Sequence, residues 1–201
     1  MCRLAGTRSP GPSTGIVTDV SESGERYGTI ADGFAARVLG VAPGQWAART
    51  PCSEWTVTDL VAHVIRTHQA VLARLDDREP GDVDPDGDLP AQWGAARLDL
   101  AMAVGDQERA SKIVGGMFGE QSFESLVGRL VCTDLLVHSW DLARATGQDE
   151  HLDPAAISAS QDFLASIDDA IRAPGGFSAK IDPAPGADDQ TRFLNFCGRV
   201  V

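Results

Sequence analysis

Asp134 and His138 are the residues whose types and spacing most directly suggest chemistry. They lie four positions apart in the segment TDLLVHSWDLARATG, residues 133–147, whose periodicity predicts a helix. On that helix the two side chains point the same way, within about 40° of each other. Both fall inside the apolar stripe of Val127, Leu130, Val131, Leu135, Leu142 and Ala145. A buried carboxylate must be hydrogen-bonded, protonated or bound to a metal, because burying it unpaired costs several kcal/mol.

Two explanations fit this buried polar pair. In the first, Asp134 accepts a hydrogen bond from His138 and both are satisfied in the core. In the second, the carboxylate and the imidazole, one helical turn apart, converge on a metal ion inside a helix bundle. Two protein ligands are too few for a stable divalent site. The second explanation therefore requires a third ligand from another helix and leaves a position open for water or substrate.

An earlier predicted helix offers two histidines as the third ligand, His63 and His68. On a helical wheel His68 falls within the apolar stripe of that helix, whereas His63 falls roughly 60° outside its edge. Periodicity alone therefore favours His68. The spacing is less specific than a zinc motif such as His-Glu-x-x-His.

The segments that must position these residues are predicted to be helical, and none alternates as a strand does. Thr56 and Asp59 form a capping box at the start of the second helix, and Gly147 ends the fourth. The expected helices run from Glu25 to about Leu39, Thr56 to Leu75, Ala91 to Ile113, about Phe123 to Thr146, Pro154 to near Arg172, and Asp188 to Phe196. This pattern predicts an all-α fold, an antiparallel four-helix bundle with additional short C-terminal helices.

The same pattern predicts how the chain is organised. Residues 1–23 are rich in Gly, Ser, Pro and Thr, which is typical of a flexible N-terminal tail. Residues 24–173 are expected to form the helical-bundle, metal-binding domain. Residues 174–201 are expected to form a C-terminal extension that packs on the bundle.

Composition limits the partners and the compartment. The chain has 201 residues and a formal net charge of -12, which argues against nucleic acid or an anionic membrane as a partner. No apolar run approaches the roughly 20 residues of a membrane-spanning helix, and the N-terminus has no secretory pattern. The scattered cysteines Cys2, Cys52, Cys132 and Cys197 are therefore interpreted as reduced packing residues of a cytoplasmic protein.

Two segments together resemble a known family. PCSEWTVTDLVAHV (residues 51–64) and DLLVHSWDLARATG (residues 134–147) are similar to the actinobacterial DinB-like metalloproteins, a family that includes mycothiol-dependent maleylpyruvate isomerase. The ending PAPGADDQTRFLNFCGR (residues 183–199) resembles a branch of metal-binding proteins of unassigned function. The resemblance covers most of the chain from about residue 25.

The resemblance implies a four-helix bundle in which His63, Asp134 and His138 bind a divalent metal. It selects His63 against the preference of the wheel, and His68 is then expected to line the cavity. The carboxylate position is usually Glu in the isomerase branch, so Asp134 is a shorter ligand. Asp141, one turn after His138, is a candidate for orienting a ligand from behind, with a surface contact as the equal alternative.

The functional expectation follows from this ligand set and from the resemblance. Zinc suits two imidazoles and a carboxylate best, with nickel, manganese or iron as alternatives. The resemblance implies mycothiol as a co-substrate, and hence a metal-dependent thiol transferase or isomerase that acts on a small electrophile. The alternative is a non-catalytic bundle that binds a metal or ligand or mediates protein contact. The partners expected are a small-molecule thiol and an electrophile, with the chain a monomer or homodimer.

Overall fold

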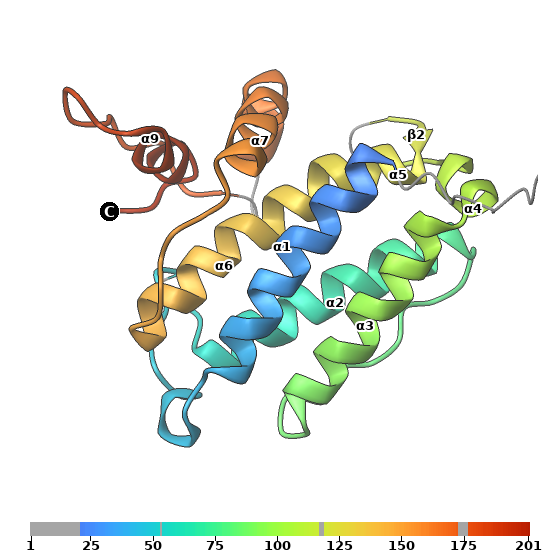
Figure 1. Ribbon diagram of the computed structural model, residues 1–201, viewed down its shortest axis with the longest axis horizontal. Helices are drawn as coiled ribbons and strands as arrows, with labels where there is room; N and C mark the ends of the chain where they lie inside the picture. The colour runs from blue at the N-terminus through green and yellow to red at the C-terminus, as the bar shows by residue number, and fades with distance from the viewer. Residues whose placement is uncertain (1–20, 53, 117–118, 173–176) are drawn as a thin grey trace, which may run out of the picture.

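A computed structural model describes residues 21–52, 54–116, 119–172 and 177–201. The expected all-α four-helix bundle is confirmed (Figure 1). Its four long elements are α1 (Glu22–Leu39), α2 (Val57–Leu75), α3 (Leu89–Gly105), and a continuous run of α5 (Phe123–Leu126), η2 (Val127–Val131) and α6 (Cys132–Thr146). Most of the tail expected at residues 1–23 lies outside the described residues, and α1 begins three residues before the expected start.

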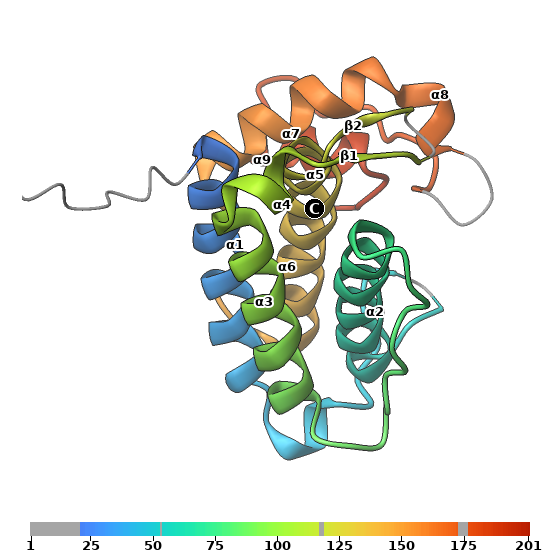
Figure 2. The same ribbon diagram turned by 90° about the vertical axis from the view of Figure 1, so that its right-hand side faces the viewer.

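Each of the four helices packs mainly against two of the others, and one long connection runs back along the bundle. Helix α1 contacts α3 and α6, and α2 contacts the same two helices. Helices α2 and α3 run in the same direction, because the segment 76–88 returns along the length of the bundle before α3 begins (Figure 2). Helices α1 and α6 run together the opposite way. The two helices that carry the candidate ligands, α2 and α6, are therefore antiparallel neighbours.

Helix α2 begins where the sequence predicts. The Thr56 hydroxyl accepts a hydrogen bond from the Asp59 backbone N–H at 3.2 Å, and the Asp59 carboxylate accepts one from the Thr56 backbone N–H at 2.9 Å. This capping box satisfies two of the backbone donors that a helix start leaves free. It fixes the first turn of the helix that carries His63.

The predicted helix from about Phe123 to Thr146 is present but contains a π-helical turn, η2. Such turns insert an extra residue and rotate the following side chains. Gly128 lies in this turn, and a side chain there would collide with Ser23 of α1. The helix ends at Gly147, whose φ of 68° is left-handed, as the predicted stop requires.

The helix expected from Ala91 to Ile113 is wrong at its C-terminal end. Helix α3 stops at Gly105, and the extended Asp106 caps a separate helix, α4 (Gln107–Ser111), by accepting from the Arg109 backbone N–H at 3.0 Å. A short hairpin follows, in which β1 (Ile113–Val114) pairs antiparallel with β2 (Gln121–Ser122). An aspartate side chain can bond to nearby backbone N–H groups and so start a new helix. Apolar periodicity alone does not show such a break.

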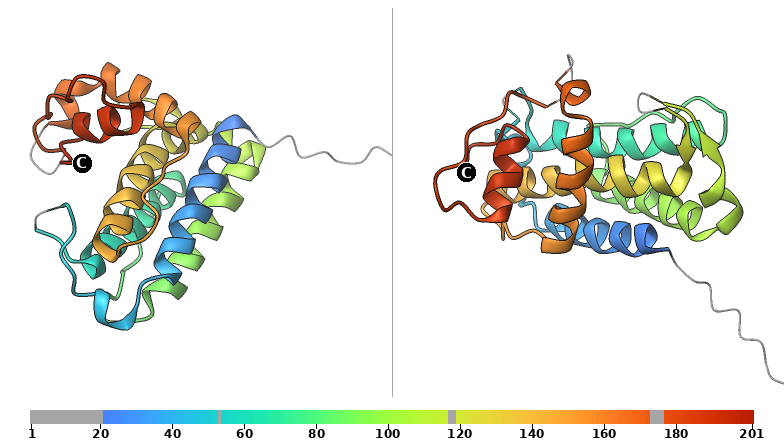
Figure 3. Two further views of the ribbon diagram at one scale, coloured as in Figure 1. Left: turned by 60° about the vertical axis from the view of Figure 1, so that its left-hand side comes forward. Right: turned by 90° about the horizontal axis from the view of Figure 1, so that it is seen from above.

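The C-terminal part lies across the bundle. Helix α7 (Pro154–Ser166) contacts α6 and α9 (Asp189–Phe196), and α7 crosses α6 steeply in Figure 3. The helix expected to continue to about Arg172 is interrupted at Ile167, after which α8 (Asp168–Ile171) begins. No helix in the described part of the chain is long and apolar enough to cross a membrane. The division into domains stays a prediction.

Candidate metal centre

Helices α2 and α6 bring His63, Asp134 and His138 together. Asp134 Oδ1 lies 3.5 Å from His63 Nε2 and 3.4 Å from His138 Nε2. One ligand atom from each of the three side chains lies within 4.8 Å of the others. The histidine that the resemblance selects, His63, is thus adjacent to the Asp134/His138 pair.

The cluster is open on one side. The side chain of His138 is 5% exposed, that of Asp134 is 20% exposed and that of His63 is 32% exposed. The Trp55 ring lies 4.5 Å from the His63 ring and 5.6 Å from the His138 ring, between centroids. The His63 edge therefore faces solvent beside an aromatic side chain.

The two separations around Asp134 Oδ1 are close to those expected around a shared cation. Ligand atoms about 2.0–2.1 Å from one tetrahedral ion lie about 3.3–3.4 Å from each other, whereas a charge-assisted N–H···O bond spans about 2.7–2.9 Å. The separations of 3.4 and 3.5 Å around Asp134 Oδ1 match the first geometry. The other oxygen, Asp134 Oδ2, is buried and has no hydrogen-bond partner, which leaves it free as a ligand.

Within the cluster, the interactions between charged side chains outweigh the effect of burial on their pKa values. Burial alone would raise the pKa of Asp134, but His138 and then His63 lower it well below its ordinary range. Burial alone would lower the pKa of His138, but Asp134 and then Asp141 raise it well above 6.5. Without a metal, the arrangement is an ionised carboxylate held between imidazoles.

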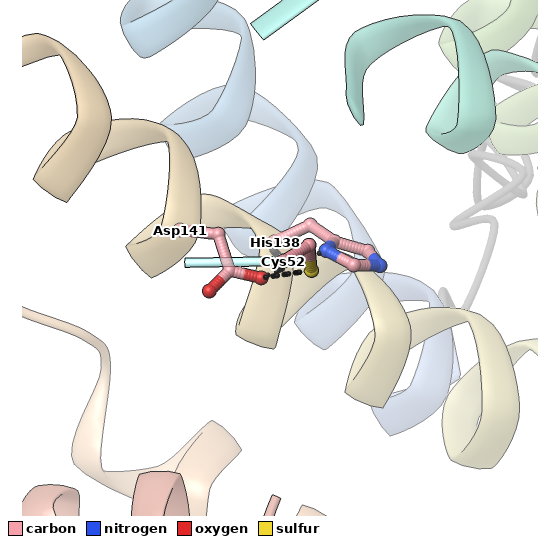
Figure 4. A group of neighbouring side chains, drawn as sticks. All are labelled: Cys52, His138 and Asp141. Atoms are coloured by element: carbon pink, nitrogen blue, oxygen red, sulfur yellow. Dashed lines mark hydrogen bonds and ion pairs between the residues drawn. The ribbon is translucent and has the colours of Figure 1, made fainter. Parts of the chain in front are cut away.

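Asp141 lies directly behind His138. It is fully buried, and its Oδ2 accepts a hydrogen bond at 3.0 Å from His138 Nδ1 (Figure 4). In a neutral imidazole, a proton held on Nδ1 by Asp141 makes Nε2 the nitrogen whose lone pair is available to a metal. Of the two positions that the sequence allows for Asp141, the structure places it behind the candidate ligand His138 rather than at the surface. The role itself stays a prediction.

Arg199 and Cys52 also contact Asp141, and neither of them was identified from the sequence as part of the site. Arg199 donates from Nε to Asp141 Oδ1 at 2.9 Å and from Nη2 to Asp141 Oδ2 at 2.8 Å. The same Nη2 lies 3.0 Å from Cys52 Sγ. Burial would raise the pKa of Asp141, but His138 and Arg199 together lower it.

Cys132 and Cys197 behave as the packing residues that the sequence predicts. Both are buried, and burial raises the pKa of Cys132 to about 11 and that of Cys197 to about 12. Cys52 differs because it is only half-buried and contacts charged groups. In the sequence, the only notable feature of Cys52 is its position shortly before the Thr56/Asp59 capping box, and that position does not predict a contact with charged groups.

Cys52, His138 and Asp141 form a second group that could in principle hold a metal. The Arg199 guanidinium already donates to Cys52 and to both Asp141 oxygens, so a cation there would meet a positive charge. The group also differs from a nucleophile triad. A triad base places one nitrogen on the nucleophile and the other on the acid, whereas His138 Nδ1 contacts Asp141 Oδ2, Nε2 lies beside Asp134 Oδ1, and Cys52 Sγ donates to Asp141 Oδ2.

His68, which the wheel favours, lies away from the candidate ligands. It is fully buried between Tyr27 and Trp93, with ring centroids 5.8 and 4.8 Å away. Its Nδ1 donates to the Val64 carbonyl at 2.8 Å, and its Nε2 has no partner. Burial lowers the pKa of His68 to about 4, so it is a neutral residue of the core at pH 7.

The fold and the cluster define a helical-bundle protein with a His–carboxylate–His group on two adjacent helices. The chain belongs to the family of the mycothiol maleylpyruvate isomerase N-terminal domain, whose family model matches residues 27–143. Its mostly helical structure agrees with the DinB-like fold. The match includes all three candidate ligands and Asp141, and stops before Arg199.

Two curated proteins are similar over most of the chain. Both are uncharacterized proteins of Mycobacterium tuberculosis, one from strain CDC 1551 and one from strain H37Rv. Each is 34% identical over 177 residues, which cover 85% of this chain and 93% of the relative. No solved structure matches the chain significantly.

Proposed function

We propose that His63, Asp134 and His138 hold one divalent metal ion, and that the protein is a metal-dependent thiol transferase or isomerase for a small electrophile. The observation that supports this most is the convergence of these three side chains from α2 and α6 at a partly exposed edge. The orphaned Asp134 Oδ2 supports it independently, because buried carboxylate oxygens are rarely left without a partner.

The donor set favours zinc, with nickel, manganese or iron as alternatives. Three protein ligands leave a fourth position, as catalytic zinc sites do, and the exposed His63 edge is where a substrate would enter. A metal ion there would lower the pKa of a bound thiol. The family name supports mycothiol as that thiol.

The chain's own residues would prepare that chemistry. Asp141 keeps the proton of His138 on Nδ1, which leaves Nε2 free to coordinate. Trp55 covers one side of the two imidazoles and limits water there. The thiol sulfur, its proton lost to solvent, would then form the bond to an electrophilic carbon of the substrate. In a transfer a leaving group would depart from that carbon with its bonding electrons; in an isomerisation the π electrons of the attacked double bond would move to the neighbouring atom, and the C–S bond would break again after rotation. None of the three ligands is assigned as the nucleophile.

Metal analysis of the protein purified without a histidine tag tests this proposal. We expect one divalent metal ion per chain, and turnover with a panel of low-molecular-weight thiols and electrophiles. His138→Ala should abolish metal binding while the helical circular dichroism spectrum is retained. Wild-type protein that binds no divalent metal, even when one is added, would refute the proposal.

A non-catalytic bundle is the competing function. The pKa directions of Asp134 and His138 describe an ion pair that is stable without a metal. A metal-loaded protein that is inactive with every thiol and electrophile would favour a ligand-binding or interaction role. A monomer or homodimer in the cytoplasm is the setting that the sequence predicts for either function.

A further inference from the structure

We infer that Arg199, near the C-terminal end of the chain, is a positioning residue for the metal centre. It fixes the Asp141 carboxylate, which in turn fixes the His138 ring with Nε2 towards the other ligands. The inference rests on the proposed function and deepens it, since it makes metal affinity depend on the docking of the C-terminal segment.

The contact between Arg199 and Asp141 has the geometry of a fork. Nε and Nη2 donate to the two carboxylate oxygens at 2.9 and 2.8 Å, which is the paired arrangement that fixes both position and plane. Asp141 Oδ2 still accepts from His138 Nδ1 at 3.0 Å. A carboxylate held in this way has one orientation, and so does the imidazole that it accepts from.

Asp141 could not keep that orientation without Arg199. Its side chain is fully buried, and a buried carboxylate that loses its charged partner must move, protonate or admit water. Any of these changes weakens the bond to His138. Partners of this kind behind a metal ligand typically contribute a factor of about 10–100 in metal affinity.

Arg199 is itself held rigidly. Its side chain is 6% exposed, its Nη1 donates to the Cys197 carbonyl at 2.9 Å, and its own carbonyl accepts from Asn195 Nδ2 at 2.9 Å. Gly198 adopts a left-handed φ of 77°, and a side chain there would lie 2.8 Å from the Ser178 Cβ. The turn that directs Arg199 inward therefore requires glycine for both conformation and space.

The guanidinium also links the two segments that supply the ligands. Asp141 belongs to α6, as do Asp134 and His138, whereas Cys52 lies in the segment that leads into α2 and His63. Arg199 Nη2 contacts both, at 2.8 Å to Asp141 Oδ2 and 3.0 Å to Cys52 Sγ. One side chain from the end of the chain thus ties the entry of α2 to the middle of α6.

Three variants separate the positioning of Asp141 from the simple docking of the C-terminal segment. They are Arg199→Ala, Arg199→Lys and, as a control, Arg172→Ala. Arg172 also holds the C-terminal segment, through the Phe196 and Ser178 carbonyls, and within the described residues it makes no hydrogen bond or ion pair with Asp141 or His138. The measurements are zinc affinity by competition with a chromophoric chelator, the visible spectrum of the cobalt-loaded protein, and the imidazole ¹⁵N shifts. With four histidines in the chain, those shifts are readily assigned.

For Arg199→Ala we expect zinc affinity to fall about 10–100-fold, an altered cobalt spectrum, and loss of the fixed Nδ1 proton of His138. Arg199→Lys keeps the charge without the fork and should recover part of the affinity, and it also serves if the alanine variant does not fold. Arg172→Ala should leave all three readouts as in wild type.

Wild-type affinity and unchanged His138 shifts in both Arg199 variants would overturn the inference. Equal losses in Arg199→Ala and Arg172→Ala would also overturn it, because docking alone would then explain them. If the wild-type protein binds no metal, the proposed function fails. The ¹⁵N shifts of the metal-free protein still test whether Arg199 positions His138.

Discussion

The imidazole Nε2 of His63 lies 3.5 Å from the carboxylate Oδ1 of Asp134, although 71 positions separate the two residues in the chain. The contact joins α2 to α6 at the partly exposed edge of the cluster. It is the relationship on which the metal proposal depends, because Asp134 and His138 already share one helix.

His63→Ala should remove metal binding, whereas His68→Leu should retain it. The reason is geometric: His63 adjoins Asp134, while His68 lies in the core against Tyr27 and Trp93. Metal content after dialysis, measured for both variants beside wild type, checks this. A His68→Leu protein that loses its metal while His63→Ala keeps it would reverse the assignment.

Asp134→Asn and Asp134→Glu should behave differently. The amide has nearly the same shape but no charge, so we expect a loss of affinity larger than the roughly 10–100-fold caused by losing an outer partner. Glutamate keeps the charge and lengthens the ligand by one methylene, so binding should persist. Titration calorimetry with zinc measures both, and equal affinities for wild type and Asp134→Asn would contradict a role in coordination.

His68 should make the protein less stable as the pH falls. Its pKa is lowered by burial from 6.5 to about 4, so below pH 6.5 the unfolded chain binds a proton that the native state does not. The contribution of neutral His68 to the free energy of unfolding is fully present above pH 6.5 and is lost progressively as the pH falls towards 4. Between pH 8 and 5 it amounts to about 2 kcal/mol.

Urea denaturation of wild type and His68→Leu at pH 8 and pH 5 measures this difference. The free energy of unfolding of His68→Leu should fall less than that of wild type, by about 2 kcal/mol. Parallel losses in the two proteins would mean that His68 is not a buried neutral residue.

Trp93→Ala should lower the free energy of unfolding by about 3–5 kcal/mol, the usual cost of a large aromatic cavity. Trp93 is 2% exposed and packs edge-on against Phe34, with ring centroids 4.9 Å apart. Met102, on the same helix and 56% exposed, supplies the control. Met102→Ala should change the stability by no more than about 0.5 kcal/mol, and equal effects in guanidinium denaturation would show that Trp93 is not a core residue.

Local rules explain what could be predicted. Apolar periodicity located the long helices, and the Thr56/Asp59 box and Gly147 set two of their ends, because caps act within one turn. The same rules failed at Asp106, where a cap interrupts a helix that the apolar pattern continues. They also favoured His68 over His63, since an ideal wheel ignores how a neighbouring helix is placed.

Local patterns in the sequence were enough to predict the class of fold, the position of Asp134 and His138 on the inward face of their helix, and the need for a partner to them. Tertiary structure decided the rest. It placed His63, and not His68, beside Asp134 through the packing of α2 against α6, and it brought Arg199 and Cys52 into contact with Asp141. A periodic pattern records which face of a helix is buried, but not which distant side chain it meets there. That choice follows from the packing of whole helices and from a C-terminal turn at Gly198, and no local signal in the chain carries either.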